Sequence, residues 1–290
     1  MSKIEWTNQT WNPIIGCSKV SPGCKNCYAE TMANRLSSIA LIKQTDEFEN
    51  FDISGLGAYA MVVKDGKWNG TTRMVPNALK KPLKRKKPTM YFVCSMSDIF
   101  HETVPFEWIY EVFDVMALTP QHTYQVLTKR PKRMLEYFKH LGQRIKEAGF
   151  DSIPTQSNDP LNYYDALPNL WLGVTAENQE QANKRIPILL QIPAKVRFVS
   201  AEPLLSAVDL TNFISTQVTH YENQLDWVIV GAESGPKRRE CKTEWVENIV
   251  NQCELTGTSV FVKQLYWNNK KISSPLVNMK VYNQFPNATN

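Results

Sequence analysis

The feature that most constrains this fold is a series of six short apolar runs rich in β-branched and aromatic residues. They occupy residues 91–94, 124–127, 170–174, 196–199, 227–230 and 260–262. A strand with its following helix takes about 30 residues, which matches most of the intervals between successive runs. The runs are apolar on both faces, as strands of a parallel sheet covered on both sides must be. The spacing therefore predicts repeated strand–helix units.

Helix-forming patterns lie between these runs. Phe106, Ile109, Phe113 and Met116, for example, are spaced to share one face of a helix. Strands that alternate with helices indicate the α/β class. The repeated units, with a further short strand expected near residues 14–15, predict a single (β/α) barrel, full or partial. A doubly wound open sheet is the alternative, and periodicity does not separate the two.

Two polar stretches interrupt this rhythm. Residues 41–75 hold four glycines, and residues 149–168 are rich in Pro, Asn, Asp and Ser. Long connections of this kind are typical of insertions or lids rather than of domain boundaries. We therefore predict one barrel domain over residues 1–266 and a polar C-terminal extension over residues 267–290.

Composition excludes several classes of protein. Six cysteines in 290 residues are too few for a disulfide scaffold. No apolar run approaches the roughly 20 residues of a membrane helix, and the N-terminus lacks the apolar core of a signal peptide. We expect a cytoplasmic protein with reduced thiols and no membrane partner. The net charge of +5 does not by itself establish a nucleic-acid partner.

Three cysteines lie close together near the N-terminus. Cys17, Cys24 and Cys27 follow the pattern C-x6-C-x2-C, with Pro22 and Gly23 as turn formers. Soft thiolates select zinc, copper(I) or iron–sulfur clusters. Structural zinc takes four protein ligands, whereas a [4Fe–4S] cluster held by three cysteines leaves one iron open. An iron–sulfur cluster, a zinc ion with a distant fourth ligand and a metal-free loop all stay open at this point.

The remaining cysteines and histidines are weaker candidates. Cys94 lies in an expected strand and Cys253 on an apolar helix face, so we predict that both are buried. Cys241 follows a basic turn and is either a surface thiol or a distant fourth ligand. His101 follows a strand-end motif and is a candidate catalytic residue, although a structural histidine is the commoner outcome.

Polar clusters follow the apolar runs. They occupy residues 95–98, 128–130, 175–178, 200–203, 231–235 and 263–264. In a parallel barrel all strand ends open on one rim, where such enzymes place their active sites. Capping of the following helices explains Ser95 and Thr175 equally well. It explains Glu177, Glu202 and Glu233 less well, and we therefore predict that these carboxylates belong to a site.

Basic segments point to a phosphate-bearing substrate. Residues 80–87, 129–133 and 237–239 are rich in Lys and Arg, and the last two directly follow strand-end motifs. Such clusters favour a nucleic acid or another phosphate-bearing partner. Aromatic residues are available to stack on bases, namely Trp6, Trp11, Tyr28 and Trp68. The alternative is a solvated basic face beside ordinary core aromatics.

The order of the motifs resembles the three-Cys-motif phage protein family, which occurs in phages and bacteria and whose activity is unsettled. The matching blocks extend over roughly residues 4–266. The family looks like a divergent branch of the radical S-adenosylmethionine (SAM) enzymes. The blocks that carry the resemblance are 11–17, 21–30, 95–101, 127–131, 200–205 and 231–235.

This resemblance implies a radical SAM-like barrel whose cysteine loop, residues 17–27, holds a [4Fe–4S] cluster through Cys17, Cys24 and Cys27. It implies SAM as a second cofactor and an electron donor such as a flavodoxin or ferredoxin. By the same analogy, cofactor-binding residues would be Ser95, Ser97, Asp98, Thr175, Glu177 and Glu202, and catalytic residues Glu233, Lys129 and His101.

The cysteine loop departs from the usual radical SAM pattern. That pattern is C-x3-C-x2-C with an aromatic residue before the last cysteine, whereas here the first gap is six residues and Asn26 precedes Cys27. Ala232 also replaces a glycine that is usual in the family. Three functions follow as hypotheses: a radical SAM-like enzyme acting on a phosphate-bearing substrate such as a nucleic-acid base, a zinc-bearing nucleic-acid-binding protein, and a metal-free barrel hydrolase. A partner protein is compatible with each.

Overall fold

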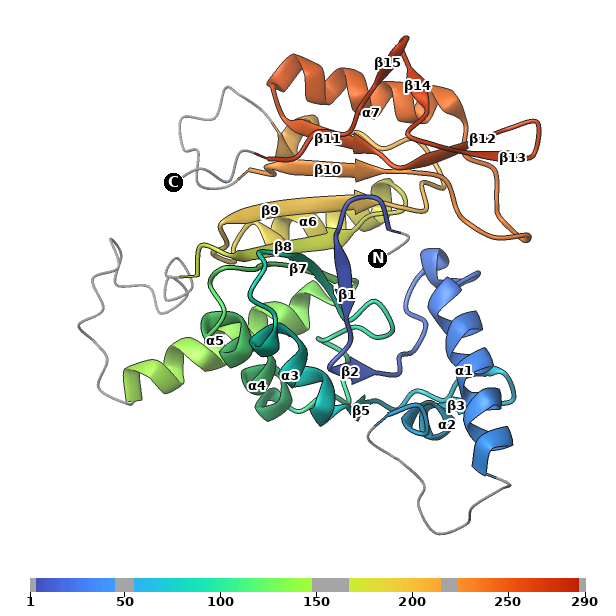
Figure 1. The fold of residues 1–290 in the computed structure, drawn as a ribbon. Helices are drawn as coiled ribbons and strands as arrows, with labels where there is room; N and C mark the ends of the chain where they lie inside the picture. The colour runs from blue at the N-terminus through green and yellow to red at the C-terminus, as the bar shows by residue number, and fades with distance from the viewer. Residues whose placement is uncertain (1–3, 45–54, 148–166, 215–223, 287–290) are drawn as a thin grey trace. The chain divides into compact units, whose positions relative to one another are not determined.

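The computed structural model describes residues 4–44, 55–147, 167–214 and 224–286. The chain divides into two compact units, Met1–Arg130 and Pro131–Asn290. Each unit contributes parallel strands and helices of its own (Figure 1). Almost all of the predicted insertion at 149–168 lies outside the described residues.

The first unit contains three parallel strands. β1 (Gln9–Trp11) pairs with β6 (Met90–Val93), which pairs with β7 (Thr123–Thr128). Most side chains of β6 and β7 are buried, as the apolar runs predicted. Its longer helices are α1 (Tyr28–Gln44), α3 (Pro76–Lys84) and α4 (Phe106–Ala117).

The first strand of the main sheet is β1, and not the expected strand at residues 14–15. Ile14–Ile15 forms β2, which pairs antiparallel with β5 (Arg73–Met74) outside the main sheet. β1 contains only one large apolar residue, the fully buried Trp11. A search for apolar runs passes over such a strand, because the other two of its three residues are polar.

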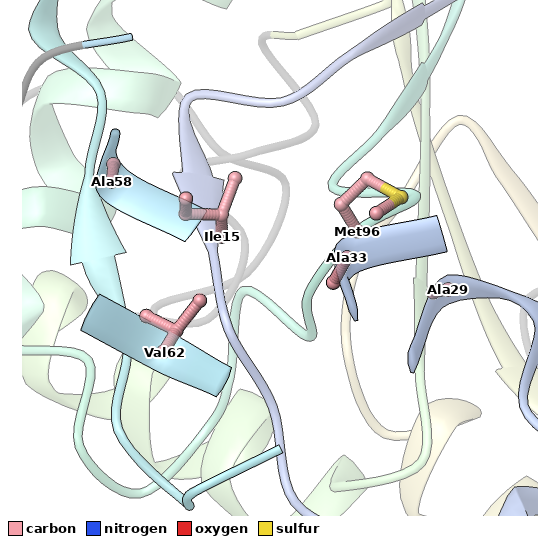
Figure 2. Packing of buried hydrophobic residues seen from close by; sticks show 6 residues of the cluster. All are labelled: Ile15, Ala29, Ala33, Ala58, Val62 and Met96. Carbon is pink, nitrogen blue, oxygen red and sulfur yellow. The ribbon is translucent and has the colours of Figure 1, made fainter. Parts of the chain in front are cut away.

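The described part of the predicted polar insertion at 41–75 is packed and structured. It contains α2 (Ala58–Val62) and a hairpin of β3 (Val63–Lys64) with β4 (Lys67–Trp68). α2 joins α1 and β2 in a buried cluster, whose side chains Figure 2 shows. This N-terminal cluster consists of Ile15, Ala29, Ala33, Ala58, Val62 and Met96.

The second unit contains four parallel strands and three longer helices. The strands are β8 (Leu170–Thr175), β9 (Val196–Ala201), β10 (Trp227–Val230) and β11 (Ser259–Val262), paired in that order. The helices are α5 (Pro131–Glu147), α6 (Gln179–Leu189) and α7 (Thr243–Thr256). Gly173 of β8 admits the ring of Phe198, because a Cβ there would lie 2.5 Å from it. Trp227 packs against Trp171, Phe198 and Phe261 and thereby fills the core of this unit.

The seven parallel strands follow one another in the order β1-β6-β7-β8-β9-β10-β11. They therefore run through the sheet in chain order. A doubly wound sheet reverses its order at a switch point, and this order has no such reversal. The α/β class is confirmed, and the connectivity is that of a partial (β/α) barrel rather than of a doubly wound sheet.

The predicted C-terminal extension at 267–290 forms hairpins instead of an irregular tail over its described residues. β12 (Gln264–Trp267) pairs with β13 (Lys270–Ser273), and β14 (Leu276–Val277) pairs with β15 (Lys280–Val281). The chain then returns to the core of the second unit, where the Trp227 indole donates to the Gln284 carbonyl. None of the helices in the described ranges is both long and apolar enough to cross a membrane.

Candidate metal-binding loop and strand-end residues

The cysteine loop, residues 17–27, is fixed at both ends by the N-terminal cluster. It begins after β2, whose Ile15 is buried in that cluster, and it ends at α1, whose Ala29 and Ala33 are buried there too. Gly16 has φ +93°, and a Cβ at this position would collide with the Thr71 carbonyl oxygen. Gly16 is therefore required where the backbone turns into the loop.

Two hydrogen bonds join the residues that flank the cysteine loop to the segment that follows β6. The Gly16 amide donates to the Met96 carbonyl over 3.2 Å. The Tyr28 hydroxyl, one residue after Cys27, donates to the Ser95 carbonyl over 3.0 Å. Cys24 closes a short 3₁₀ turn, Pro22–Cys24. The loop is thus attached to the segment that follows β6 at two separate points.

All three loop cysteines are free thiols and are half-buried. The pKa of the Cys17 thiol is raised to about 12, chiefly by burial and then by the charge of Asp98, whereas the Arg130 guanidinium opposes the shift. The charge of Cys27 also raises this pKa, so these two thiols interact electrostatically. Across the described residues, no three His, Cys, Asp or Glu side chains are gathered closely enough to hold a metal ion.

Asp98, a predicted cofactor ligand, is buried and accepts several hydrogen bonds at the end of β6. The Thr128 hydroxyl donates to its Oδ1 over 2.7 Å, and the Lys129 amide donates to its Oδ2 over 3.0 Å. The Phe100 amide donates to Oδ1 over 3.0 Å. Asp98 therefore ties the ends of β6 and β7 together.

Arg130 links this strand end to the cysteine loop, and sequence reasoning did not single it out as a site residue. Its side chain is only 5% exposed, and its Nη1 lies 3.2 Å from Asp98 Oδ2 and 4.0 Å from Cys17 Sγ. Its Nε donates to both carboxylate oxygens of Glu102 at 2.9 Å. Its Nη2 donates to Ser18 Oγ over 2.8 Å. Its signals in the sequence were its place at the end of a strand run and its position in the basic segment 129–133.

His101 is buried and is joined to the same loop residue. Its Nε2 lies 2.8 Å from Ser18 Oγ, and its Nδ1 accepts from the Thr103 amide over 3.1 Å. Burial lowers the pKa of His101, and the Arg130 charge lowers it further. With Nδ1 acting as acceptor, the neutral ring carries its proton on Nε2 and donates it to Ser18. In this arrangement His101 positions the loop and does not act as a base toward the Ser18 hydroxyl.

The other predicted residues of the first unit lie around the same strand ends. Ser95 donates through its hydroxyl to Asn12 Oδ1 over 3.1 Å, and the Ser97 amide donates to the Cys94 carbonyl. Lys129 is half-buried. The structure thus brings Ser95, Ser97, Asp98, Lys129 and His101 to the segments that follow β6 and β7. Their functional roles stay predictions.

In the second unit, Glu177 is completely buried behind the end of β8. Its Oε2 accepts from Arg185 Nη1 over 2.9 Å, and the same nitrogen donates to the Thr175 carbonyl over 2.7 Å. Neither side chain of this ion pair is more than 5% exposed. Glu177 and Arg185 therefore form a buried pair that connects β8 to α6.

Glu202 and Glu233 also have cationic partners of their own. Glu202, after β9, accepts from the ammonium of Lys263 and from Gln264 Nε2. Glu233, after β10, accepts from the Arg239 amide over 2.8 Å and from Nε of the same guanidinium over 2.9 Å. Their predicted roles toward cofactor and substrate are not tested by these contacts, which show only that both carboxylates are bound within the protein.

The remaining cysteines and predicted stacking residues divide by burial. Cys94 and Cys253 are buried, as predicted. Cys241 is half-buried in the second unit. Trp6 and Trp11 are buried, so the expectation that they stack on bases is wrong.

Several side chains of the basic segments make contacts within the protein. In the 80–87 segment, Lys81 donates through its ammonium to the Thr10 carbonyl over 2.6 Å. In the 237–239 segment, Arg239 is bound to Glu233, as described above, and Arg238 lies 4.0 Å from the Tyr266 ring centroid. These segments are therefore not simply solvated surface charge.

Comparison with known proteins identifies a family. The sequence model of a family described as DUF5131, a protein of unknown function, matches residues 1–286. No curated protein and no solved structure matches the chain. The family match spans both units, including the cysteine loop, and agrees with the expected family of unsettled activity.

Proposed function

This chain belongs to the DUF5131 family, and we propose that it is an iron–sulfur enzyme of the radical SAM type. Cys17, Cys24 and Cys27 would hold a [4Fe–4S] cluster, and the substrate would carry phosphate. The observation that carries this proposal is the attachment of a three-thiol loop to the carboxyl ends of parallel strands through one buried guanidinium. The carboxyl ends of such strands are where barrel enzymes place their chemistry.

The donor set is chemically suited to an iron–sulfur cluster. Three free thiols lie on one short loop, and a thiolate at Cys27 would raise the pKa of Cys17. Thiolates rather than thiols ligate metals, and the raised pKa of Cys17 means that metal binding must displace its proton. The half-buried thiols are not gathered around a point, so cluster binding would have to draw the three of them together.

Arg130 supplies the fixed positive charge that a thiolate cluster needs. Its guanidinium is held by Asp98 and Glu102, so it cannot swing away from Cys17. A cation beside a thiolate favours the ionised form. Hydrogen bonds and charges near cluster sulfurs tune the reduction potential. Arg130 would therefore stabilise the loaded loop without itself being a ligand.

Cys17, Cys24 and Cys27 would hold the cluster, which would supply one-electron reductive cleavage of SAM to methionine and a 5′-deoxyadenosyl radical, with the electron coming from a donor such as a flavodoxin or ferredoxin. This chain's own residues would bind and orient SAM. Ser95 and Ser97 lie at the end of β6, in the position that the resemblance assigns to contacts with SAM. Asp98 has little capacity to accept further hydrogen bonds from SAM, because its carboxylate oxygens already accept from Thr128, Lys129 and Phe100. We therefore assign Asp98 a positioning role for this strand end.

Anaerobic reconstitution tests the proposal. We expect about four irons and four sulfides per chain, visible absorption that bleaches with dithionite, and release of methionine from SAM by the reduced protein. Replacement of Cys17, Cys24 and Cys27 by Ala should abolish all three signals. Cys241→Ala is the matched control, because it removes a half-buried thiol outside the loop and should leave iron content unchanged.

The same experiment separates the competing hypotheses. A colourless protein with one zinc per chain would favour the zinc-bearing nucleic-acid-binding protein. A protein that contains no metal, and whose hydrolytic activity survives replacement of the three loop cysteines, would favour the hydrolase. A cluster that forms but never cleaves SAM would retain the iron–sulfur assignment and remove the radical SAM chemistry.

A further inference from the structure

The β12–β13 hairpin of the second unit has a tightly defined geometry. Its two-residue turn, Asn268–Asn269, has φ values of 47° and 61°. Positive φ at both central positions is the mark of a type I′ turn, and asparagine tolerates it better than other residues with a side chain. The turn fixes the register, so Trp267 lies opposite Lys270 and Tyr266 lies opposite Lys271.

One face of this hairpin pairs an exposed aromatic ring with a cation. Trp267 is 69% exposed, although burial of an indole is normally a large gain in folding. Lys270 is exposed too, and residues directly opposite in an antiparallel pair project from the same face. A planar apolar ring and an ammonium thus lie side by side in solvent.

The other face repeats this combination. The Arg238 guanidinium lies 4.0 Å from the centroid of the Tyr266 ring, within the range of a cation–π contact. Its Nη2 also donates to Asn269 Oδ1 over 2.8 Å, so the loop after β10 is attached to the hairpin turn. Lys271 lies opposite Tyr266 on the partner strand. Cations therefore line both faces of one hairpin.

The chain segment that contains this hairpin has no acidic residue of its own. Residues 255–290 contain four lysines and neither Asp nor Glu. Three of the four, Lys270, Lys271 and Lys280, belong to the two hairpins. Of these, Lys280 is paired with Glu254 of α7. This local charge selects an anionic partner.

We propose that the β12–β13 hairpin binds single-stranded nucleic acid, with Trp267 stacked on a base and Lys270, Lys271 and Arg238 facing phosphates. Stacking on an exposed indole needs an unpaired base, which a duplex does not offer. A lipid surface fits less well, because the tip between Trp267 and Lys270 consists of two asparagines, whose amides resist transfer into an apolar phase. This proposal does not depend on the iron–sulfur chemistry.

Binding of a fluorescently labelled oligothymidylate to the full chain, followed by anisotropy at several salt concentrations, tests the proposal. Trp267→Ala should weaken binding by about tenfold, since stacking of one base on an aromatic residue contributes on that scale. Lys270→Ala with Lys271→Ala should make the negative slope of log affinity against log salt less steep by about 1.4, the value for two single-strand phosphate contacts.

A second hairpin supplies the matched control. Lys64 and Lys67 lie opposite each other in the β3–β4 hairpin of the first unit. Their joint replacement by Ala removes the same charge from a similar turn, and it should leave oligothymidylate affinity within about twofold, because neither lysine belongs to the proposed binding hairpin. The triple cysteine variant should bind like the unmodified chain, which separates this proposal from the iron–sulfur proposal.

Three outcomes would overturn the hairpin assignment. The first is oligothymidylate binding that neither hairpin variant changes. The second is equal loss of affinity in the Lys64/Lys67 control, which would indicate general charge attraction. The third is binding to anionic lipid vesicles that depends on Trp267 without any binding to oligothymidylate, which would indicate a membrane surface.

Discussion

The charged residues at the strand ends are paired differently in the two units of this protein. In the first unit, one guanidinium serves several partners at once, because Arg130 contacts Asp98, Glu102, Ser18 and Cys17. In the second unit, each carboxylate has its own cation, as Glu177 has Arg185, Glu202 has Lys263 and Glu233 has Arg239.

This difference changes what the carboxylates can do. A carboxylate with a dedicated buried cation is held in place and is costly to disturb. A guanidinium shared between a loop and two carboxylates couples the position of the loop to the strand ends. The second unit therefore contains separate ion pairs, whereas the first unit contains one connected network of polar side chains beside free thiols.

The largest effect should come from the buried pair of the second unit. Glu177→Ala leaves Arg185 buried without its carboxylate, and we expect the free energy of unfolding to fall by about 3–5 kcal/mol. Urea denaturation followed by circular dichroism measures this loss. The control is Glu180→Ala on α6, which removes an exposed pair with Lys184 and should cost about 0.5 kcal/mol or less. Equal effects of the two variants would show that Glu177 does not brace the unit.

A double-mutant cycle tests the shared network of the first unit. Asp98→Asn and Glu102→Gln each remove one acceptor of Arg130, and the double variant removes both carboxylates. We expect the double variant to lose about 1–2 kcal/mol more than the sum of the single losses, because residues in one network are coupled.

The corresponding cycle in the second unit uses Glu180→Gln and Glu202→Gln, which have different cationic partners. Its losses should add within about 0.5 kcal/mol. Additivity in both units, measured by urea denaturation, would mean that Arg130 does not connect its partners as the contacts suggest.

The contrast also explains what the sequence could and could not predict. The β8 to β11 strands and the burial of Cys94 and Cys253 could be predicted from apolar patterns in the sequence. A strand that is buried on both faces is continuously apolar whichever strands lie beside it. β1 was not predicted, because its single buried residue, Trp11, produces no hydrophobic periodicity.

Pairings between strand ends were harder to predict than the strands. Arg130 was visible only as one cation among several in a basic segment, and its role depends on Glu102 and Ser18, which belong to other loops. Lys263 and Glu202 are 61 residues apart, so only the fold brings them together. The sequence gives the residue types at the strand ends, whereas charge pairing depends on three-dimensional neighbours.

The smallest effect should come from Lys263→Ala, because this pair is intermediate between the buried and the exposed ones. Both side chains are 15% exposed, and Glu202 keeps a 2.9 Å hydrogen bond from Gln264 Nε2 when the ammonium is removed. We expect a loss of about 1 kcal/mol in the free energy of unfolding, between the values for exposed and buried pairs. The loss should shrink in 1 M salt, at which the screening length is about 3 Å. Lys280→Ala, which breaks the exposed pair with Glu254, is the control and should cost less. A loss of stability for Lys263→Ala as large as that for Glu177→Ala would contradict the distinction between these two ion pairs. It would mean that the hydrogen bond from Gln264 does not compensate Glu202 for the missing ammonium.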